Sequence, residues 1–116
     1  IKNEFRQVVL NLITNAKDEL LERDVNKPKI EIKIIEEDDI CSIKVIDNAG
    51  GIPKKILERV FEPYFSTKEQ GKGTGLGLYM SKRIIEESMK GKISVENGKN
   101  GAIFSINMSR CKAKIL

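Results

Sequence analysis

The chain has 116 residues, of which 40% are hydrophobic and 33% are charged, and its formal net charge is +4. This composition is typical of one soluble globular domain that buries its core without disulfides or metals. The modest positive charge suits an anionic ligand or an acidic protein partner, and its diffuse distribution excludes an obvious nucleic-acid surface. Because the chain contains no histidine, it has no imidazole zinc ligand, general base or phosphate acceptor of its own.

The cysteines and the first residues bear on where the protein works. Cys41 and Cys111 are far apart and lack the spacing of metal ligands, so we expect reduced thiols in the cytoplasm. There is neither a signal-peptide pattern nor an apolar stretch long enough to cross a membrane, so we expect that these residues are not themselves membrane-bound. Helical periodicity begins at once without an initiator methionine, and we therefore expect a fragment of a longer protein, which is either soluble or anchored in the inner membrane.

The first predicted element is an amphipathic helix over residues 3–23. Its apolar face recurs at the three-to-four spacing of a helix and consists of Phe5, Val8, Val9, Leu12, Ile13, Ala16 and Leu20. Beside this face stand Asn11 and Asn15, although asparagine costs about 0.5 kcal/mol relative to alanine in a helix. Either each amide satisfies a neighbouring backbone group, or both amide oxygens face a cleft and hold a hard cation such as Mg²⁺ together with phosphate oxygens.

Two strands, 29–36 and 40–46, are expected to follow as a β-hairpin, because isoleucine and valine alternate along both. The second strand leads into the sequence DNAGGIP at 47–53. This sequence is compatible with ordinary turn chemistry. It also suits a binding loop in which two glycines let the backbone touch a flat ligand, while Asp47 accepts a hydrogen bond from an exocyclic amine such as that of adenine.

Pro53 is expected to be the first residue of a short helix over 53–60. The sequence FEPYFSTKEQGKG then carries three aromatic residues without helical periodicity. We interpret 61–65 as an ordered anchor for a loop that closes over a bound nucleotide as a lid. The alternative is a packed surface loop whose aromatic side chains fill the edge of the core.

The sequence EQGKGTGLGL at 69–78 has glycine at every second position and runs directly into a helix that begins near Leu76. A glycine-rich loop before a helix N-terminus suits a phosphate, and Lys68 and Lys72 add positive charge. The spacing matches neither the P-loop nor the GxGxxG pattern. A polyphosphate site and a flexible surface loop both remain open on these residues alone.

The last predicted helix ends near residues 90–91 with Gly91 as its C-terminal cap. Two further strands, 92–96 and 102–108, are joined by the hairpin sequence NGKNG. The basic tail at 109–116 carries no functional signal.

Together these segments resemble the ATP-binding catalytic domain of two-component sensor histidine kinases, in the superfamily that includes type II topoisomerases, heat-shock chaperones and mismatch-repair ATPases. QVVLNLITNA is similar to the N box of that family, DNAGGIP to its first glycine box, FEPYFSTK to its F box, GKGTGLGL to its second glycine box and NGKNGAIF to its weaker third one. The resemblance covers nearly the whole chain as a single domain. It implies a two-layer α/β sandwich in which a mixed, mostly antiparallel sheet packs against three helices.

The resemblance also assigns roles to single residues. It makes Asn15, with Asn11 beside it, the catalytic residues that hold Mg²⁺ and phosphate, and it makes Asp47 the acceptor for the adenine amine. Other contacts to ATP or to the lid are implied for Gly51, Ile52, Phe61, Phe65, Thr67, Lys68, Gly71, Lys72, Gly73, Thr74, Gly75, Leu76, Gly77 and Leu78.

Three positions of the site depart from the family pattern. Asp18 stands where many members have a Lys or Arg that contacts phosphate. Ala49 replaces the first glycine of the first glycine box, which is tolerable only if its φ is negative. Ala102 stands where a Thr often helps to hold the adenine-bound water and carboxylate network.

The resemblance implies a kinase domain that binds ATP and Mg²⁺ and presents the γ-phosphate to a histidine on a separate dimerisation domain of the same full-length protein, with a response regulator downstream. Three alternatives stay open: an anti-sigma-type serine kinase, a mechanical ATPase that would need a general base such as Glu4, and a non-catalytic nucleotide-sensing module.

Overall fold

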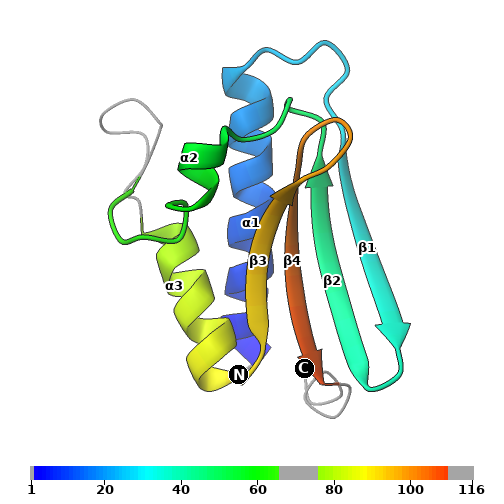
Figure 1. The fold of residues 1–116 in the computed structure, drawn as a ribbon, viewed down its shortest axis with the longest axis vertical. Coiled ribbons are helices and arrows are strands. Elements are labelled where there is room, and N and C mark those ends of the chain that lie inside the picture. Colours follow the sequence, from blue (N-terminus) through cyan, green and yellow to red (C-terminus); the bar gives the residue numbers. More distant parts are fainter. Residues whose placement is uncertain (1, 66–75, 110–116) are drawn as a thin grey trace.

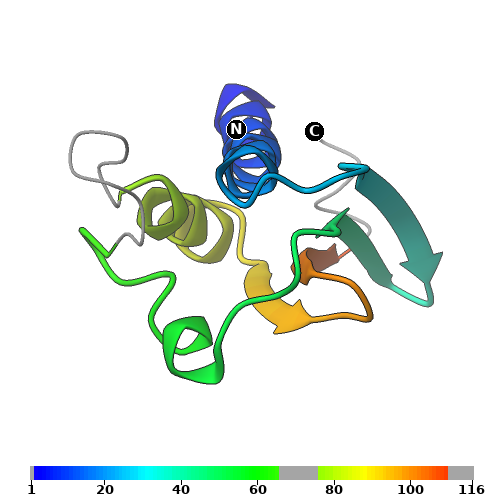
Figure 2. The same ribbon diagram turned by 90° about the horizontal axis from the view of Figure 1, so that it is seen from above.

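The computed structural model describes residues 2–65 and 76–109 of the chain. They form two layers, with helices on one face of a four-stranded sheet (Figures 1 and 2). The elements are α1 (Lys2–Glu22), β1 (Ile30–Glu37), β2 (Ile40–Asp47), α2 (Lys54–Leu57), α3 (Gly77–Arg83), the π-helical turn η1 (Ile84–Ser88), β3 (Lys92–Asn97) and β4 (Ala102–Ser109). No helix within the described ranges is both long and apolar enough to cross a membrane.

The sheet has the strand order β1-β2-β4-β3. Both predicted hairpins are confirmed, and β4, the last strand that the structure describes, lies between β2 and β3. Each pair of neighbouring strands that the structure describes is antiparallel. The two-layer α/β fold implied by the resemblance is therefore confirmed, with a sheet that is antiparallel throughout its described part.

The core lies between α1, the turn η1 and the middle of the sheet. Val8 and Leu12 of α1 are fully buried, as the periodicity of the first helix predicts, and Phe104 and Ile106 of β4 are at most 1% exposed. Burial of this kind stabilises the fold by about 1.5–3 kcal/mol for each large apolar side chain. β1 is an edge strand of the sheet, and its Ile34 is 68% exposed.

The end of the helical region after α3 differs from the prediction. The left-handed residue that ends it is Lys90, with φ 57°, and not Gly91. The amide of Gly91 donates to the carbonyl of Ile85 at 2.9 Å, six positions earlier in the chain, which closes the end of the wider π-helical turn. Glycine is needed at 91 for another reason, because a Cβ there would lie 2.7 Å from the carbonyl oxygen of Asn107 in β4.

The predicted helix over 53–60 is shorter than expected. Pro53 precedes α2 as its N-cap, with φ −56° and ψ 143°, and is not the first helical residue. The carbonyl of Pro53 accepts from the amides of Ile56 and Leu57 at 2.9 and 3.0 Å. The next bond, from Arg59 to Ile56 at 2.9 Å, spans only three residues, so the helix tightens into turns and ends.

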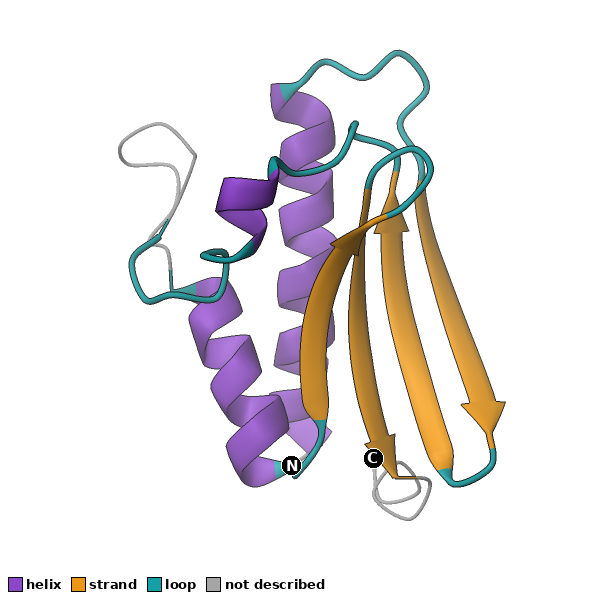
Figure 3. Cartoon of the chain, in the orientation of Figure 1, coloured by secondary structure: helices purple, strands orange, loops and turns teal. Residues whose placement is uncertain are grey.

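Segments from distant parts of the chain lie together at one end of the molecule. Figure 3 shows the C-terminal end of α1, the loop that follows β2 and the β3–β4 connection together there. α1 and α3 lie side by side on the same face of the sheet (Figure 2). This arrangement brings together most of the described residues that the sequence singled out.

The burial pattern of α1 predicts how unevenly its leucines contribute to stability. Leu12 is fully buried, whereas Leu10 on the same helix is 56% exposed. We expect Leu12→Ala to lower the free energy of unfolding by about 2–5 kcal/mol because it leaves a cavity in the core. Leu10→Ala is the matched control and should change it by no more than about 0.5 kcal/mol. Urea unfolding followed by circular dichroism measures both, and equal losses would contradict this packing.

Candidate functional site

Asp47 is the last residue of β2 and is only 5% exposed. Its Oδ1 accepts a hydrogen bond from the amide of Ala49 at 3.0 Å and from the amide of Ala102 at 3.2 Å. No described group donates to the second carboxylate oxygen, and no buried side-chain polar atom in the described ranges lacks a partner. That oxygen is therefore accessible, and it can accept a hydrogen bond from a ligand.

Gly101 leaves the space that this carboxylate occupies. A Cβ at Gly101 would overlap the backbone oxygen and the Oδ1 atom of Asp47. Ala102, the next residue, contributes its backbone amide, so the site uses a group that any residue but proline supplies. The departure at Ala102 therefore leaves the hold on Asp47 intact.

The loop 48–52 bends sharply away from the sheet after Asp47. Gly50 and Gly51 have φ values of 97° and 87°, a region that residues with a Cβ rarely adopt. Ala49 does not have a positive φ, so alanine fits at this position as expected. The amide of Gly50 donates to the carbonyl of Asn100 at 2.9 Å, which fixes the loop against the β3–β4 connection.

Two side chains from other segments hold the same loop, and the sequence analysis missed both. Arg23 Nη1 donates to the carbonyl of Ala49 at 2.7 Å, and Arg23 also pairs with Glu19 at 3.3 Å. Asn97 accepts from the amide of Ile52 and donates to its carbonyl, both at 2.8 Å. Within the loop, the Asn48 side chain accepts a hydrogen bond from the amide of Lys29 and donates one to the carbonyl of Lys27. Only the turn-forming sequence NGKNG hinted at Asn97, and it gives no indication of the partner.

The two asparagines of the first helix differ in their surroundings. Asn11 Nδ2 donates to Ser81 Oγ at 3.3 Å and to the carbonyl of Gly77 at 3.5 Å. Its Oδ1 accepts from Gln7 at 2.9 Å. Asn11 thus ties α1 to the first turn of α3, where the buried Ser81 hydroxyl also donates to Gly77 at 2.8 Å.

Asn15 lies one turn further along α1 and is half-buried. Its side chain makes no hydrogen bond to any residue that the structure describes, so its amide oxygen is available to a ligand. Asp18, one turn beyond Asn15, is also half-buried. No cluster of three or more acidic, cysteine or histidine side chains that could bind a metal occurs in the described ranges. A hard cation here would therefore rely on neutral amide oxygen and on the phosphates of a ligand, a donor set that fits Mg²⁺.

The aromatic anchor expected at 61–65 has two contacts. The Phe61 ring packs edge-on against the core residue Phe104, with centroids 6.2 Å apart and an interplanar angle of 86°. The guanidinium of Arg59 lies over the Phe65 ring, 4.7 Å from its centroid. Leu76 and Gly77 lie at the start of α3, and Leu78 packs against the core. The other residues assigned to the lid and the phosphates lie outside the described ranges, namely Thr67, Lys68, Gly71, Lys72, Gly73, Thr74 and Gly75.

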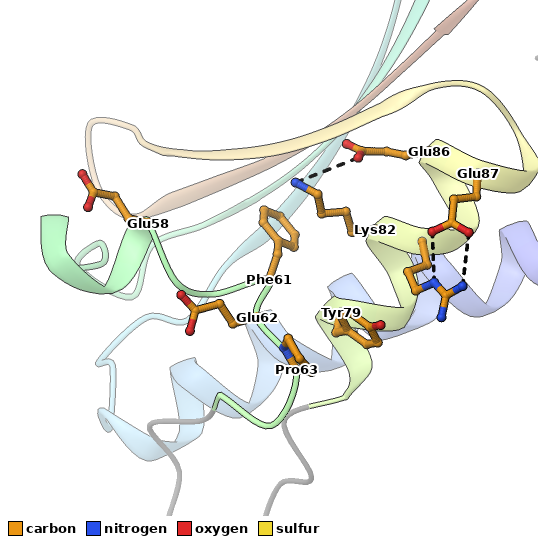
Figure 4. A pocket seen from close by; sticks show the side chains of 9 residues that line it. Glu58, Phe61, Glu62, Pro63, Tyr79, Lys82, Glu86 and Glu87 are labelled. Carbon is orange, nitrogen blue, oxygen red and sulfur yellow. Dashed lines mark hydrogen bonds and ion pairs between the residues drawn. The ribbon is translucent and has the colours of Figure 1, made fainter.

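A separate open hollow lies on the outer side of α3, between this helix and the segment 58–63 (Figure 4). Phe61, Tyr79 and four carboxylates contribute to its lining. Arg83 donates to Glu87 at 3.0 and 3.2 Å, which raises the pKa of Arg83 and lowers the pKa of Glu87. Neither the two asparagines nor Asp47 lines it, so the hollow is distinct from the candidate site.

Comparison with known proteins places the chain in a family. Residues 1–110 match the family model described as histidine kinase-, DNA gyrase B- and HSP90-like ATPase. The chain is 38% identical over 109 residues to the two-component sensor PprA of Pseudomonas aeruginosa, a match that covers 91% of this chain and 12% of that protein. It is 36% identical over 110 residues to sporulation kinase A of Bacillus subtilis, covering 94% of this chain and 17% of that protein.

Solved structures give the same result. The nucleotide-free catalytic domain of the histidine kinase ThkA superposes with a TM-score of 0.79 at 33% sequence identity, covering 95% of this chain and 69% of that one. Full-length ShkA in complex with AMPPNP superposes with a TM-score of 0.74 at 25% identity, covering 90% of this chain and 21% of that one. The chain thus spans only a small part of the sensor proteins that it matches, and it belongs to the family of histidine kinase-, DNA gyrase B- and HSP90-like ATPases.

Proposed function

We propose that this domain binds ATP with Mg²⁺ and donates the γ-phosphate to a histidine on a separate dimerisation domain of the same full-length protein, within a two-component signalling system. The observation that carries the proposal is the hydrogen bonding of the buried Asp47 carboxylate. One of its carboxylate oxygens is fixed by the amides of Ala49 and Ala102, while the other is free to accept a hydrogen bond.

This geometry favours adenine over guanine. An ionised carboxylate can accept hydrogen bonds but cannot donate them, and adenine presents an exocyclic amine as a donor. Guanine has a carbonyl oxygen at the same position of the ring, and that oxygen would face the carboxylate without a proton between them. A site built to pair with one donor rejects the analogue that lacks it. Gly51 and Ile52, the next residues of the loop, would border the base.

The phosphates would lie toward α1 and the start of α3. Asn15 would hold the cation through its amide oxygen, and Mg²⁺, when bound, neutralises charge on the phosphates. Asn11 would keep the first turn of α3 in place through Ser81 and Gly77. Its own Oδ1 accepts one hydrogen bond from Gln7, so a direct contact to the cation would use the remaining lone pair of that oxygen.

In this proposal no covalent phosphate intermediate forms on this domain. It contains no histidine, so the acceptor would lie on another domain, and these residues would act by positioning the nucleotide and stabilising charge. Relatives named as two-component sensors are far longer than this chain, and this leaves room for such a domain. A response regulator would receive the phosphate next, in the cytoplasm.

Two substitutions test the assignment of the nucleotide site. Asp47→Asn replaces an acceptor by an amide that also donates, and Asn15→Ala removes the proposed ligand of the cation. We expect each to weaken binding of a non-hydrolysable ATP analogue by at least about 1 kcal/mol while the domain stays folded. Isothermal titration calorimetry with and without Mg²⁺ measures this, and circular dichroism checks the fold.

The two variants should differ in their dependence on the cation. Asn15→Ala should lose most of the gain in affinity that Mg²⁺ gives the wild type, whereas Asp47→Asn should retain that gain. A GTP analogue serves as the specificity control, because the wild type should bind it much more weakly. Unchanged affinity in both variants would mean that the site lies elsewhere.

A separate prediction concerns phosphotransfer. Because the chain has no histidine, we expect it to bind ATP without labelling itself on histidine. When mixed with the dimerisation domain of its own full-length protein, it should transfer ³²P from the γ-position of ATP to that domain in an acid-labile, base-stable linkage. Acid-stable labelling would instead indicate a serine kinase, and nucleotide binding without any transfer would indicate a sensing module.

A further inference from the structure

Asn97, the last residue of β3, holds the loop 48–52 through its side chain. The Asn97 amide accepts from the backbone N–H of Ile52 and donates to the backbone C=O of the same residue, both at 2.8 Å. These bonds join residues 45 positions apart in the chain. One side chain thereby fixes both polar groups of a loop residue, as a neighbouring strand would.

Neighbouring contacts leave this loop little freedom to move. A Cβ on Gly51 would lie 3.0 Å from Asn97 Oδ1, so the amide sits directly against the glycine backbone. The amide of Gly50 is held by the carbonyl of Asn100 at 2.9 Å. Arg23 holds Ala49 from the other side at 2.7 Å.

These contacts affect ligand binding as well as stability. Two consecutive glycines have more backbone freedom than residues with a side chain, so ordering them costs conformational free energy. If the loop were unrestrained, a ligand that contacts it would have to supply that free energy on binding. A loop that is already fixed leaves the full contact energy available for affinity.

We propose that Asn97 is a positioning residue for the nucleotide base. It holds Gly51 and Ile52 in the conformation that receives adenine, and so it sets the affinity for the base without affecting the affinity for the triphosphate. This inference rests on the proposed function. The contacts at the expected phosphate side, from Asn11 to Ser81 and Gly77, share no residue with the Asn97 contacts.

The test compares two ligands that differ by the nucleoside. Asn97→Ala and the wild type are titrated calorimetrically with Mg-AMPPNP and, up to millimolar concentrations, with Mg-tripolyphosphate, which has no base. We expect the variant to bind AMPPNP about tenfold more weakly, as for the loss of one to two ordered hydrogen bonds, and to bind tripolyphosphate within about twofold of the wild type. The amides at 50–52 should also exchange hydrogen faster in the variant, while those of β4 keep their protection.

A matched control separates this effect from amide truncation in general. Asn26 is exposed, lies between α1 and β1, and its side chain makes no hydrogen bond within the described ranges. Asn26→Ala should leave both affinities and the exchange rates unchanged. If Asn97→Ala does not fold, Asn97→Asp provides the second variant, because it keeps the acceptor for the amide of Ile52 but replaces the donor by a carboxylate oxygen that faces the Ile52 carbonyl. It should show a loss of the same kind.

The outcomes separate this inference from the proposed function. If the wild type binds AMPPNP and Asn97→Ala binds it equally well, the positioning role is wrong and the kinase assignment stands. If AMPPNP and tripolyphosphate weaken by the same factor, or if β4 also loses protection, Asn97 is a general stabilising residue and the inference is overturned. If the wild type binds no adenine nucleotide, the proposed function fails, and this inference fails with it.

Discussion

The candidate site depends on a buried carboxylate of which only one oxygen is hydrogen-bonded to the described part of the protein. Asp47 is held through one oxygen by the amides of Ala49 and Ala102. A charged side chain so deeply buried is costly unless hydrogen bonds compensate. Those bonds come from two segments, the loop after β2 and the first residue of β4, so both must be in place together. The pairing of β2 with β4 in the sheet brings them together.

The remaining contacts around the site extend the same constraint to the rest of the fold. Arg23 at the end of α1 and Asn97 at the end of β3 hold the loop that Asp47 begins. Asn11, in the middle of α1, holds the start of α3. α1 therefore contributes its apolar face to the core, one polar side to α3 and its C-terminal end to the loop. Through these three sets of contacts, α1 fixes the loop after β2 and the start of α3 relative to the sheet.

The sequence predicted the elements that have a periodic pattern of apolar residues, but it did not predict the contacts between residues far apart in the chain. The alternation in the strands and the apolar face around Leu12 predicted the two layers, because burial on one face requires those spacings. No local pattern could show that Asn11 has its amide engaged by α3 and Gln7 while Asn15 does not, since both stand on one helical face. The roles of Arg23 and Asn97 depend on partners 26 and 45 residues away. The requirement for glycine at 91, next to the left-handed Lys90, likewise comes from a tertiary contact, the close approach of Gly91 to β4.

The most direct measurement is a crystal structure of the domain with a non-hydrolysable ATP analogue and Mg²⁺. We predict the exocyclic amine of adenine within hydrogen-bond distance of the free oxygen of Asp47, the base beside Gly51 and Ile52, and Mg²⁺ bound by the amide oxygen of Asn15 and by phosphate oxygens. A base bound away from Asp47, or a cation held without Asn15, would contradict the site on which the proposed function rests.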